Sequence, residues 1–142
     1  TRGHISLSQI QEIDLKLQQA PAHKIKLIAA HQPFYTPPDH SHGVKDCPML
    51  GRIALEQWSQ HGLNGLLHGH LHHAAVYDLN QIYQLGVSHP VLDIHAGTAT
   101  SYRLHAGLPN SLNIILPNAD VQHLSFNAAT NHFELMQQNT SD

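Results

Sequence analysis

The sequence predicts an α/β fold, in which two helices alternate with two strands and a strand-rich part follows. Two observations carry this prediction. Apolar residues recur at helical spacing in two segments, and each segment precedes a short apolar run of the kind that forms buried strands. Beyond residue 73 the apolar runs are short and are separated by glycine, proline and asparagine, which is typical of consecutive strands.

Length and composition favour a single segment over residues 1–142. Of these 142 residues, 12% are charged and 41% are hydrophobic. This length and this hydrophobic share are enough to bury a core. The net charge of -3 argues against a nucleic-acid binder that works by phosphate neutralisation alone. No apolar run approaches the ~18 residues of a membrane helix, and no signal segment opens the chain. With its lone Cys47, the chain is expected to be cytoplasmic and not to contact a membrane.

The first helix is expected to begin at Ser6, whose hydroxyl can form a capping box with Gln9. Apolar residues at helical spacing follow, and Pro21 ends the helix. The next segment, residues 25–30, is a nearly continuous apolar run. Such a run favours a strand that is covered on both faces of its sheet.

The second helix is expected over residues 48–61, with Gly62 as its C-terminal cap. Its expected inner face is Leu50, Ile53, Ala54 and Trp58. A strand over residues 63–67 then leads into a run of histidines. The later strands are expected at residues 74–79, 81–85, 91–95, 112–116, 121–126 and 132–136.

Histidine is the most unusual feature of the composition, because the chain contains 15 of them. His70 and His72 would project from the same side of an extended segment and could converge on one site. His31 follows the first strand, and sites gather at the carboxyl ends of strands in α/β sheets. Three converging imidazoles suit zinc, iron or manganese. The alternative is a surface pair on a turn, with His31 bonded to a nearby carbonyl.

Three stretches of the chain resemble the calcineurin-like metallophosphoesterases, near their cyclic-nucleotide and glycerophosphodiester phosphodiesterase branch. Each stretch surrounds the end of an expected strand, and the entry to a late strand at residues 109–113 fits as well. The stretches are residues 25–33 (IKLIAAHQP), 66–72 (LLHGHLH) and 95–103 (HAGTATSYR).

The resemblance implies a fold, a cofactor and an activity. The chain would be the C-terminal half of a four-layer αββα sandwich that hydrolyses a phosphodiester or phosphomonoester, cyclic nucleotides included, by a metal-activated hydroxide. The full-length protein would bind two divalent transition-metal ions (manganese, iron or zinc). His31 and His70 would ligate one of them, and His72 the other.

The chain departs from the family in what precedes these stretches. The family's D-x-H, G-D-x-x and G-N-H-[DE] motifs lie upstream of such stretches, and none of the three is expected in this chain. Anionic ligands are needed to hold two cations close together. The chain alone is therefore expected to bind at most about one metal ion, to be inactive, and to contain no catalytic residue of its own. Its expected partner is its own N-terminal half or a second copy.

Further residues are candidates for touching the substrate or for orienting a ligand, although solvated or structural roles are open for each. They are His40, His42, His73, Thr98 and Arg103. His68 is expected to pack or cap, away from the site. The alternative function is a non-catalytic, histidine-rich fragment that binds metal or oligomerises.

Overall fold

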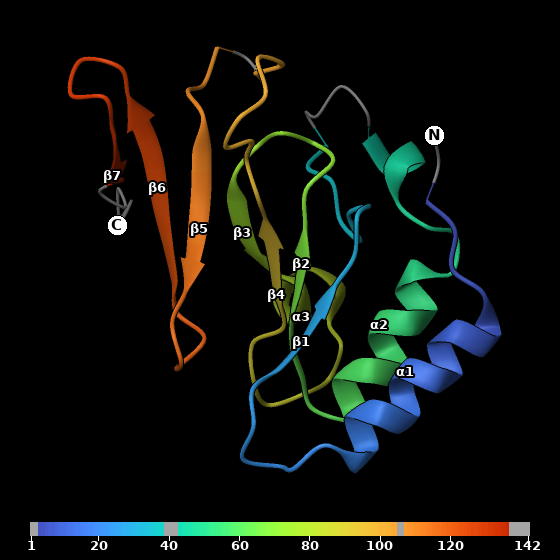
Figure 1. Cartoon of the computed structure of the whole chain (residues 1–142). Coiled ribbons are helices and arrows are strands. Elements are labelled where there is room, and N and C mark those ends of the chain that lie inside the picture. The colour runs from blue at the N-terminus through green and yellow to red at the C-terminus, as the bar shows by residue number, and fades with distance from the viewer. Residues whose placement is uncertain (1–2, 39–42, 105–106, 137–142) are drawn as a thin grey trace.

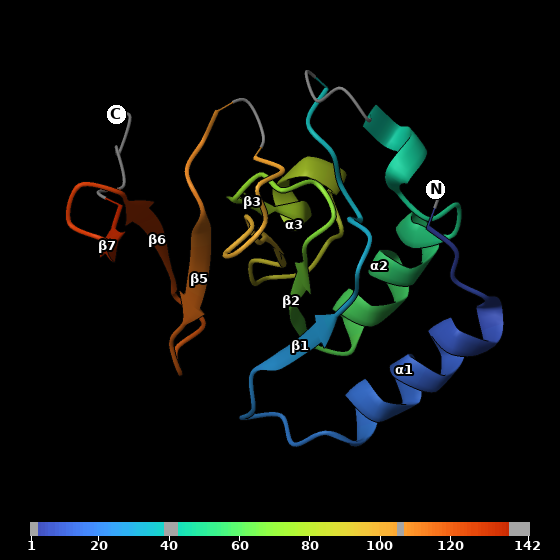
Figure 2. The same cartoon turned by 45° about the horizontal axis from the view of Figure 1, so that its top comes forward.

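The computed structural model describes residues 3–38, 43–104 and 107–136, and these form a mixed α/β architecture. Helices α1 and α2 cover one side of a four-stranded sheet, and a three-stranded sheet stands on the other side (Figures 1 and 2). The helices are α1 (Leu7–Gln19), the 3-10 helix η1 (Gly43–Asp46), α2 (Gly51–Gln60) and α3 (Leu79–Tyr83). The strands are β1 (Lys26–Ala29), β2 (Leu63–His68), β3 (Ala75–Asp78), β4 (Leu92–His95), β5 (Ser111–Ile115), β6 (Val121–Asn127) and β7 (His132–Leu135).

The first sheet has the strand order β1-β2-β4-β3. Strands β1, β2 and β4 run parallel, and β3 returns antiparallel beside β4. The register aligns His68 at the end of β2 with His95 at the end of β4. Because parallel strands end at the same edge, the histidines at or just after the ends of β1, β2 and β4 gather there.

The second sheet is an antiparallel meander, β5-β6-β7. One side-chain contact between the sheets is the amide of Asn113, whose Nδ2 donates to the carbonyl oxygen of His95 at 2.8 Å. A hollow of about 440 Å³ lies between the sheets, with Leu67 and Ile94 on one wall and Leu112 and Ile115 on the other. The second sheet therefore contacts the first close to the ends of its central strands.

The main core lies between the helices and the first sheet. Trp58, Leu55, Leu63 and Leu66 are fully buried there. Leu55 replaces the expected Ile53 on the inner face of α2, and Ile53 is 48% exposed. That expectation is wrong because α2 begins at Gly51 and turns its Gly51, Ala54, Leu55, Trp58 and Ser59 stripe inward.

Two further expectations need correction. Residues 81–85 do not form a strand: the Asp78 carboxylate caps α3 by accepting from the backbone N–H of Asn80 at 2.9 Å, and Gln84 ends α3 in the left-handed region. Strand β1 is not covered on both faces, because it is an edge strand whose Leu27 and Ala29 are exposed. The capping box of Ser6 and Gln9 at the start of α1 is confirmed.

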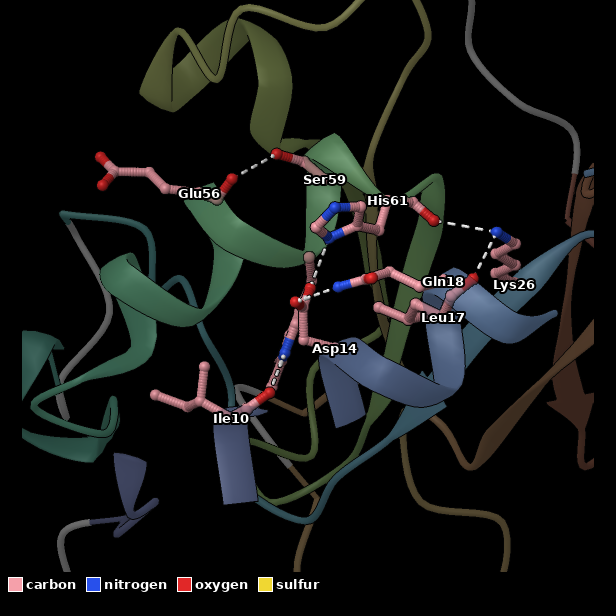
Figure 3. A network of polar contacts seen from close by, with 9 residues as sticks. Ile10, Asp14, Leu17, Gln18, Lys26, Glu56, Ser59 and His61 are labelled. Carbon is pink, nitrogen blue, oxygen red and sulfur yellow. Dashed lines mark hydrogen bonds and ion pairs between the residues drawn. The ribbon is translucent and has the colours of Figure 1, made fainter. Parts of the chain in front are cut away.

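Polar contacts hold the two long helices to each other and to β1 (Figure 3). The buried Asp14 carboxylate on α1 accepts from Nδ1 of His61 at 2.6 Å and from Nε2 of Gln18 at 2.8 Å. Lys26 on β1 donates from Nζ to the carbonyl oxygens of Leu17 at 2.7 Å and His61 at 2.9 Å. These carbonyls belong to the ends of α1 and α2, where helices lack internal partners.

The carboxyl of Asp14 makes the stability of the chain depend on pH. Burial alone would raise its pKa, but hydrogen bonds from Gln57, His61 and Gln18 hold it below its ordinary value. A carboxyl with a lowered folded-state pKa contributes stability above the unfolded pKa of about 4, and this contribution is lost as the pH falls further. We expect Asp14→Asn to lower the free energy of unfolding by about 1–2 kcal/mol at pH 7 and by progressively less below pH 4.

Urea unfolding followed by circular dichroism from pH 7 to pH 3 would measure this difference. The exposed Asp120→Asn is the matched control and should change the free energy little at any pH. A gap between the Asp14→Asn variant and the parent that stays constant across this range would contradict the assignment.

None of the helices in the described part of the chain is both long enough and apolar enough to cross a bilayer.

Candidate metal centres

The carboxyl ends of β1 and β2 bring two of the predicted ligands together. His31 follows β1 and His70 follows β2. The Nε2 atom of His31 lies 3.3 Å from the Nδ1 atom of His70, and the ring centroids are 5.2 Å apart in an edge-to-face arrangement. His31 is exposed, so this pair is open to solvent and to a ligand.

His70 and His72 do not lie on an extended segment, so that expectation is wrong. Strand β2 ends at His68, and the chain then turns, with the N–H of Leu71 donating to the carbonyl oxygen of Gly69 at 2.6 Å. His70 and His72 have φ angles of 59° and 55°, in the left-handed region. Leu71 between them is buried and anchors the turn.

His72 points to a different part of the edge from His70. Its Nδ1 donates to the carbonyl oxygen of Arg103 at 2.7 Å. A hydrogen bond at one ring nitrogen fixes the tautomer and leaves Nε2 as the atom available for a metal. Among the described residues, His31, His70 and His72 do not gather into one group of ligand atoms.

A carboxylate lies behind His70. Asp46, at the end of η1, is buried, and its Oδ1 is 3.5 Å from Nε2 of His70. His70 therefore has Asp46 on one ring nitrogen and His31 beside the other. Metal-binding histidines are commonly oriented by a carboxylate in this way.

The distance between the two imidazole nitrogens fits a shared metal ion. Zinc–nitrogen bonds of about 2.0–2.1 Å at a tetrahedral angle place two ligand nitrogens about 3.4 Å apart. His31 Nε2 and His70 Nδ1 are 3.3 Å apart. The two nitrogens have the spacing of ligands to one ion, and the rings would turn out of their present hydrogen bond to bind it.

The remaining candidates lie around this edge or outside the described residues. His40 and His42 lie outside the described residues. Thr98 accepts from the backbone N–H of Ser101 with its hydroxyl, which closes a turn. Arg103 is exposed, and its guanidinium carbon is 5.9 Å from the centre of the Tyr102 ring.

A second group of possible ligands, fully buried, lies beneath the same edge. His68, Asp93 and His95 offer ligand atoms that all lie within 4.8 Å of one another. Nε2 of His68 is 2.9 Å from Oδ1 of Asp93, and Nε2 of His95 is 3.0 Å from Oδ2. The three side chains are 0% exposed. Such a group could hold one metal ion.

The electrostatics of this group follow from its burial. Burial alone would raise the pKa of Asp93, but the two imidazoles hold it below its ordinary value. Burial lowers the pKa of His95, against the opposing effect of Asp93. The charge of Asp93 also affects Tyr83. Burial, followed by the charges of Cys47 and Asp93, raises the pKa of Tyr83 to about 12.

The sequence pattern does not predict this second group. The expectation that His68 packs away from any site is wrong, because its Nε2 lies beside the Asp93 carboxylate. The expectation that the chain lacks an Asp-x-His motif is wrong, because Asp93-Ile94-His95 is such a triplet and is the local signal for this group. His73 is half-buried close by, where its charge adds to the effect of burial in lowering the pKa of His95 and His123.

No protein-family model matches this sequence, and no curated protein matches it either. The interpretation of the site therefore rests on the residues themselves and on their geometry.

Proposed function

We propose that the chain supplies the histidine ligands of a metal-dependent phosphoesterase. The observation that carries this proposal is the 3.3 Å spacing of His31 Nε2 and His70 Nδ1 at the ends of two adjacent parallel strands. The resemblance of the three stretches to calcineurin-like phosphoesterases, including the Gly69-His70-Leu71-His72 motif, supports the same function. The four-layer sandwich is part of this proposal.

The side chains of this edge have distinct tasks in the proposed site. His31 and His70 bind the cation, and Asp46 orients the His70 ring from behind. His72 is held in one tautomer by the Arg103 carbonyl and presents Nε2 to a second cation. A divalent metal ion bound there would polarise a phosphoryl oxygen and lower the pKa of a bound water.

The substrate would be a phosphodiester or a phosphomonoester, cyclic nucleotides included. Arg103 is a candidate donor to its phosphate, since its backbone is tied to His72 and its side chain is exposed. A guanidinium presents a planar fork of donors that suits phosphate oxygens. The anionic ligands of a two-metal site would come from an N-terminal half or from a second copy of the chain.

Metal binding without catalysis is the second candidate function. It is favoured by the all-imidazole ligand set of His31, His70 and His72, because imidazoles alone do not hold two cations close together. The two functions differ in whether the bound metal recognises phosphate esters.

Calorimetric titration of the chain with Zn²⁺ or Mn²⁺ tests the proposed site. We expect the double variant His31→Ala/His70→Ala to lose at least about 100-fold in affinity at this site, because removal of ligands costs more than removal of their orienting partners. Replacement of the exposed His132 by alanine is the matched control and should leave the affinity unchanged.

A second titration, of p-nitrophenyl phosphate into the metal-loaded chain, separates the two candidate functions. Binding that requires the metal and weakens in Arg103→Ala would support the phosphoesterase. Metal binding without any affinity for the ester would favour the non-catalytic function. Equal metal affinity of the parent and the His31→Ala/His70→Ala variant would contradict both assignments at this site.

A further inference from the structure

We propose that His68, Asp93 and His95 form a second, buried site for a divalent transition-metal ion. This site shares no residue with the His31–His70 pair, and it is independent of the proposed hydrolysis. Its role would be structural, because it joins the last residue of β2 to the last residues of β4.

The topology brings the three ligands together without help from flexible loops. Asp93 and His95 are two residues apart on β4, so they project from the same face of the sheet. His68 is the register partner of His95 on the parallel neighbour β2. Their side chains are completely buried, and the centroids of the two imidazole rings are 3.9 Å apart.

Hydrogen bonding alone does not satisfy this group. His95 Nε2 donates to Asp93 Oδ2 at 3.0 Å. His68 Nε2 and Asp93 Oδ1 are only 2.9 Å apart, yet they are not aligned as a hydrogen bond, and neither buried atom has another hydrogen-bond partner among the described residues. Within the same part of the chain, Nδ1 of His95 has no hydrogen-bond partner either. Buried polar atoms are rarely left in this state.

A shared cation explains that arrangement. Two ligands of one metal approach each other closely while their lone pairs point to a third position rather than at each other. Zinc ligands lie about 3.3–3.5 Å apart around a tetrahedral centre. The ligand atoms of this group all lie within 4.8 Å of one another, and the two histidine–carboxylate pairs are 2.9 Å and 3.0 Å apart.

The charge of Asp93 also favours a bound cation at this site. A carboxylate that is removed from water needs a cation, and within the described part of the chain its ion-pair partners are the two imidazoles alone. A divalent ion would supply the missing positive charge. Two imidazoles and one carboxylate suit zinc or another first-row metal rather than calcium or magnesium.

The double variant His31→Ala/His70→Ala allows the buried site to be measured alone. We expect this protein to bind about one Zn²⁺ per chain. Zinc should shift the imidazole ¹⁵N resonances of His68 and His95, leave those of His132 unchanged, and raise the midpoint of thermal unfolding by roughly 5–10 °C. These measurements leave all three proposed ligands intact, so they do not depend on the folding of a core variant.

Replacing Asp93 by asparagine keeps the size of the side chain and removes its charge. We expect Asp93→Asn, in the same double variant, to bind Zn²⁺ at least about 100-fold more weakly, with Asp120→Asn as the control. Unchanged resonances of His68 and His95 after zinc addition, or a thermal midpoint that zinc does not move, would overturn the proposal and leave a purely hydrogen-bonded cluster. Loss of the His31–His70 site in the titrations above would leave this result unaffected.

Discussion

Replacement of Trp58 by alanine is expected to remove a large share of the stability of the fold. Trp58 is fully buried between α2 and α1, its ring lies 5.8 Å from that of Phe34, and its Nε1 donates to the carbonyl oxygen of Ile10 at 3.0 Å. Truncation of a buried tryptophan costs about 3–5 kcal/mol, against a total stability of roughly 5–15 kcal/mol for most domains.

Guanidinium unfolding followed by circular dichroism would measure this loss, since the variant lacks the fluorescent side chain. Trp58→Phe should lose less, because it keeps an aromatic ring and gives up the hydrogen bond to Ile10. Tyr102→Ala removes an aromatic ring that is 87% exposed and should change the stability little. A Trp58→Ala variant as stable as the parent would show that Trp58 is not a major part of the core between the helices and the first sheet.

Replacement of Lys26 by methionine is expected to have the second-largest effect. Its Nζ donates to two carbonyl oxygens, one at the end of α1 and one just after α2. Charged hydrogen bonds are worth about 1.5–3 kcal/mol each, and a cation at a helix C-terminus adds to them. Methionine keeps the apolar stem and loses both bonds, so we expect a loss of about 2–4 kcal/mol.

The nearby Lys24 provides the matched control for this experiment. It is exposed, two residues before Lys26, and Lys24→Met also removes one positive charge. Urea unfolding of the two variants separates the specific contacts from the change in net charge. Equal stabilities of the two variants would contradict the proposed role of Lys26.

The elements that the sequence predicts correctly are those with a strong local signal. The capping box at Ser6, the helix before Gly62 and the alternating strands of the second sheet each follow from residues close together in the chain. The short helix α3 was missed because its apolar residues also fit a strand, and the cap at Asp78 decides between them. The exposure of β1 depends on the strand order, which the sequence does not encode locally.

The two candidate sites also differ in how far the sequence alone predicts them. His31 and His70 could be placed together because both follow strands that run parallel. The buried group could not be assembled from spacing, since His68 and His95 meet only through the register of β2 with β4. Asp46 reaches His70 through the fold of η1, and no spacing between the two residues in the sequence predicts that contact.

The left-handed backbone at His70 and His72 sets the stability of this turn against the metal binding that we propose for it. A residue with a Cβ atom costs about 1–2 kcal/mol of stability in this conformation, and glycine avoids this cost because it has no Cβ. Gly69 beside them has an ordinary φ and open space around its Cα, so the glycine of the motif is not at the position of greatest backbone need. Laboratory evolution for heat resistance alone should therefore favour glycine or asparagine at positions 70 and 72. Such variants would gain thermal stability and would lose the imidazoles through which we propose that the protein works.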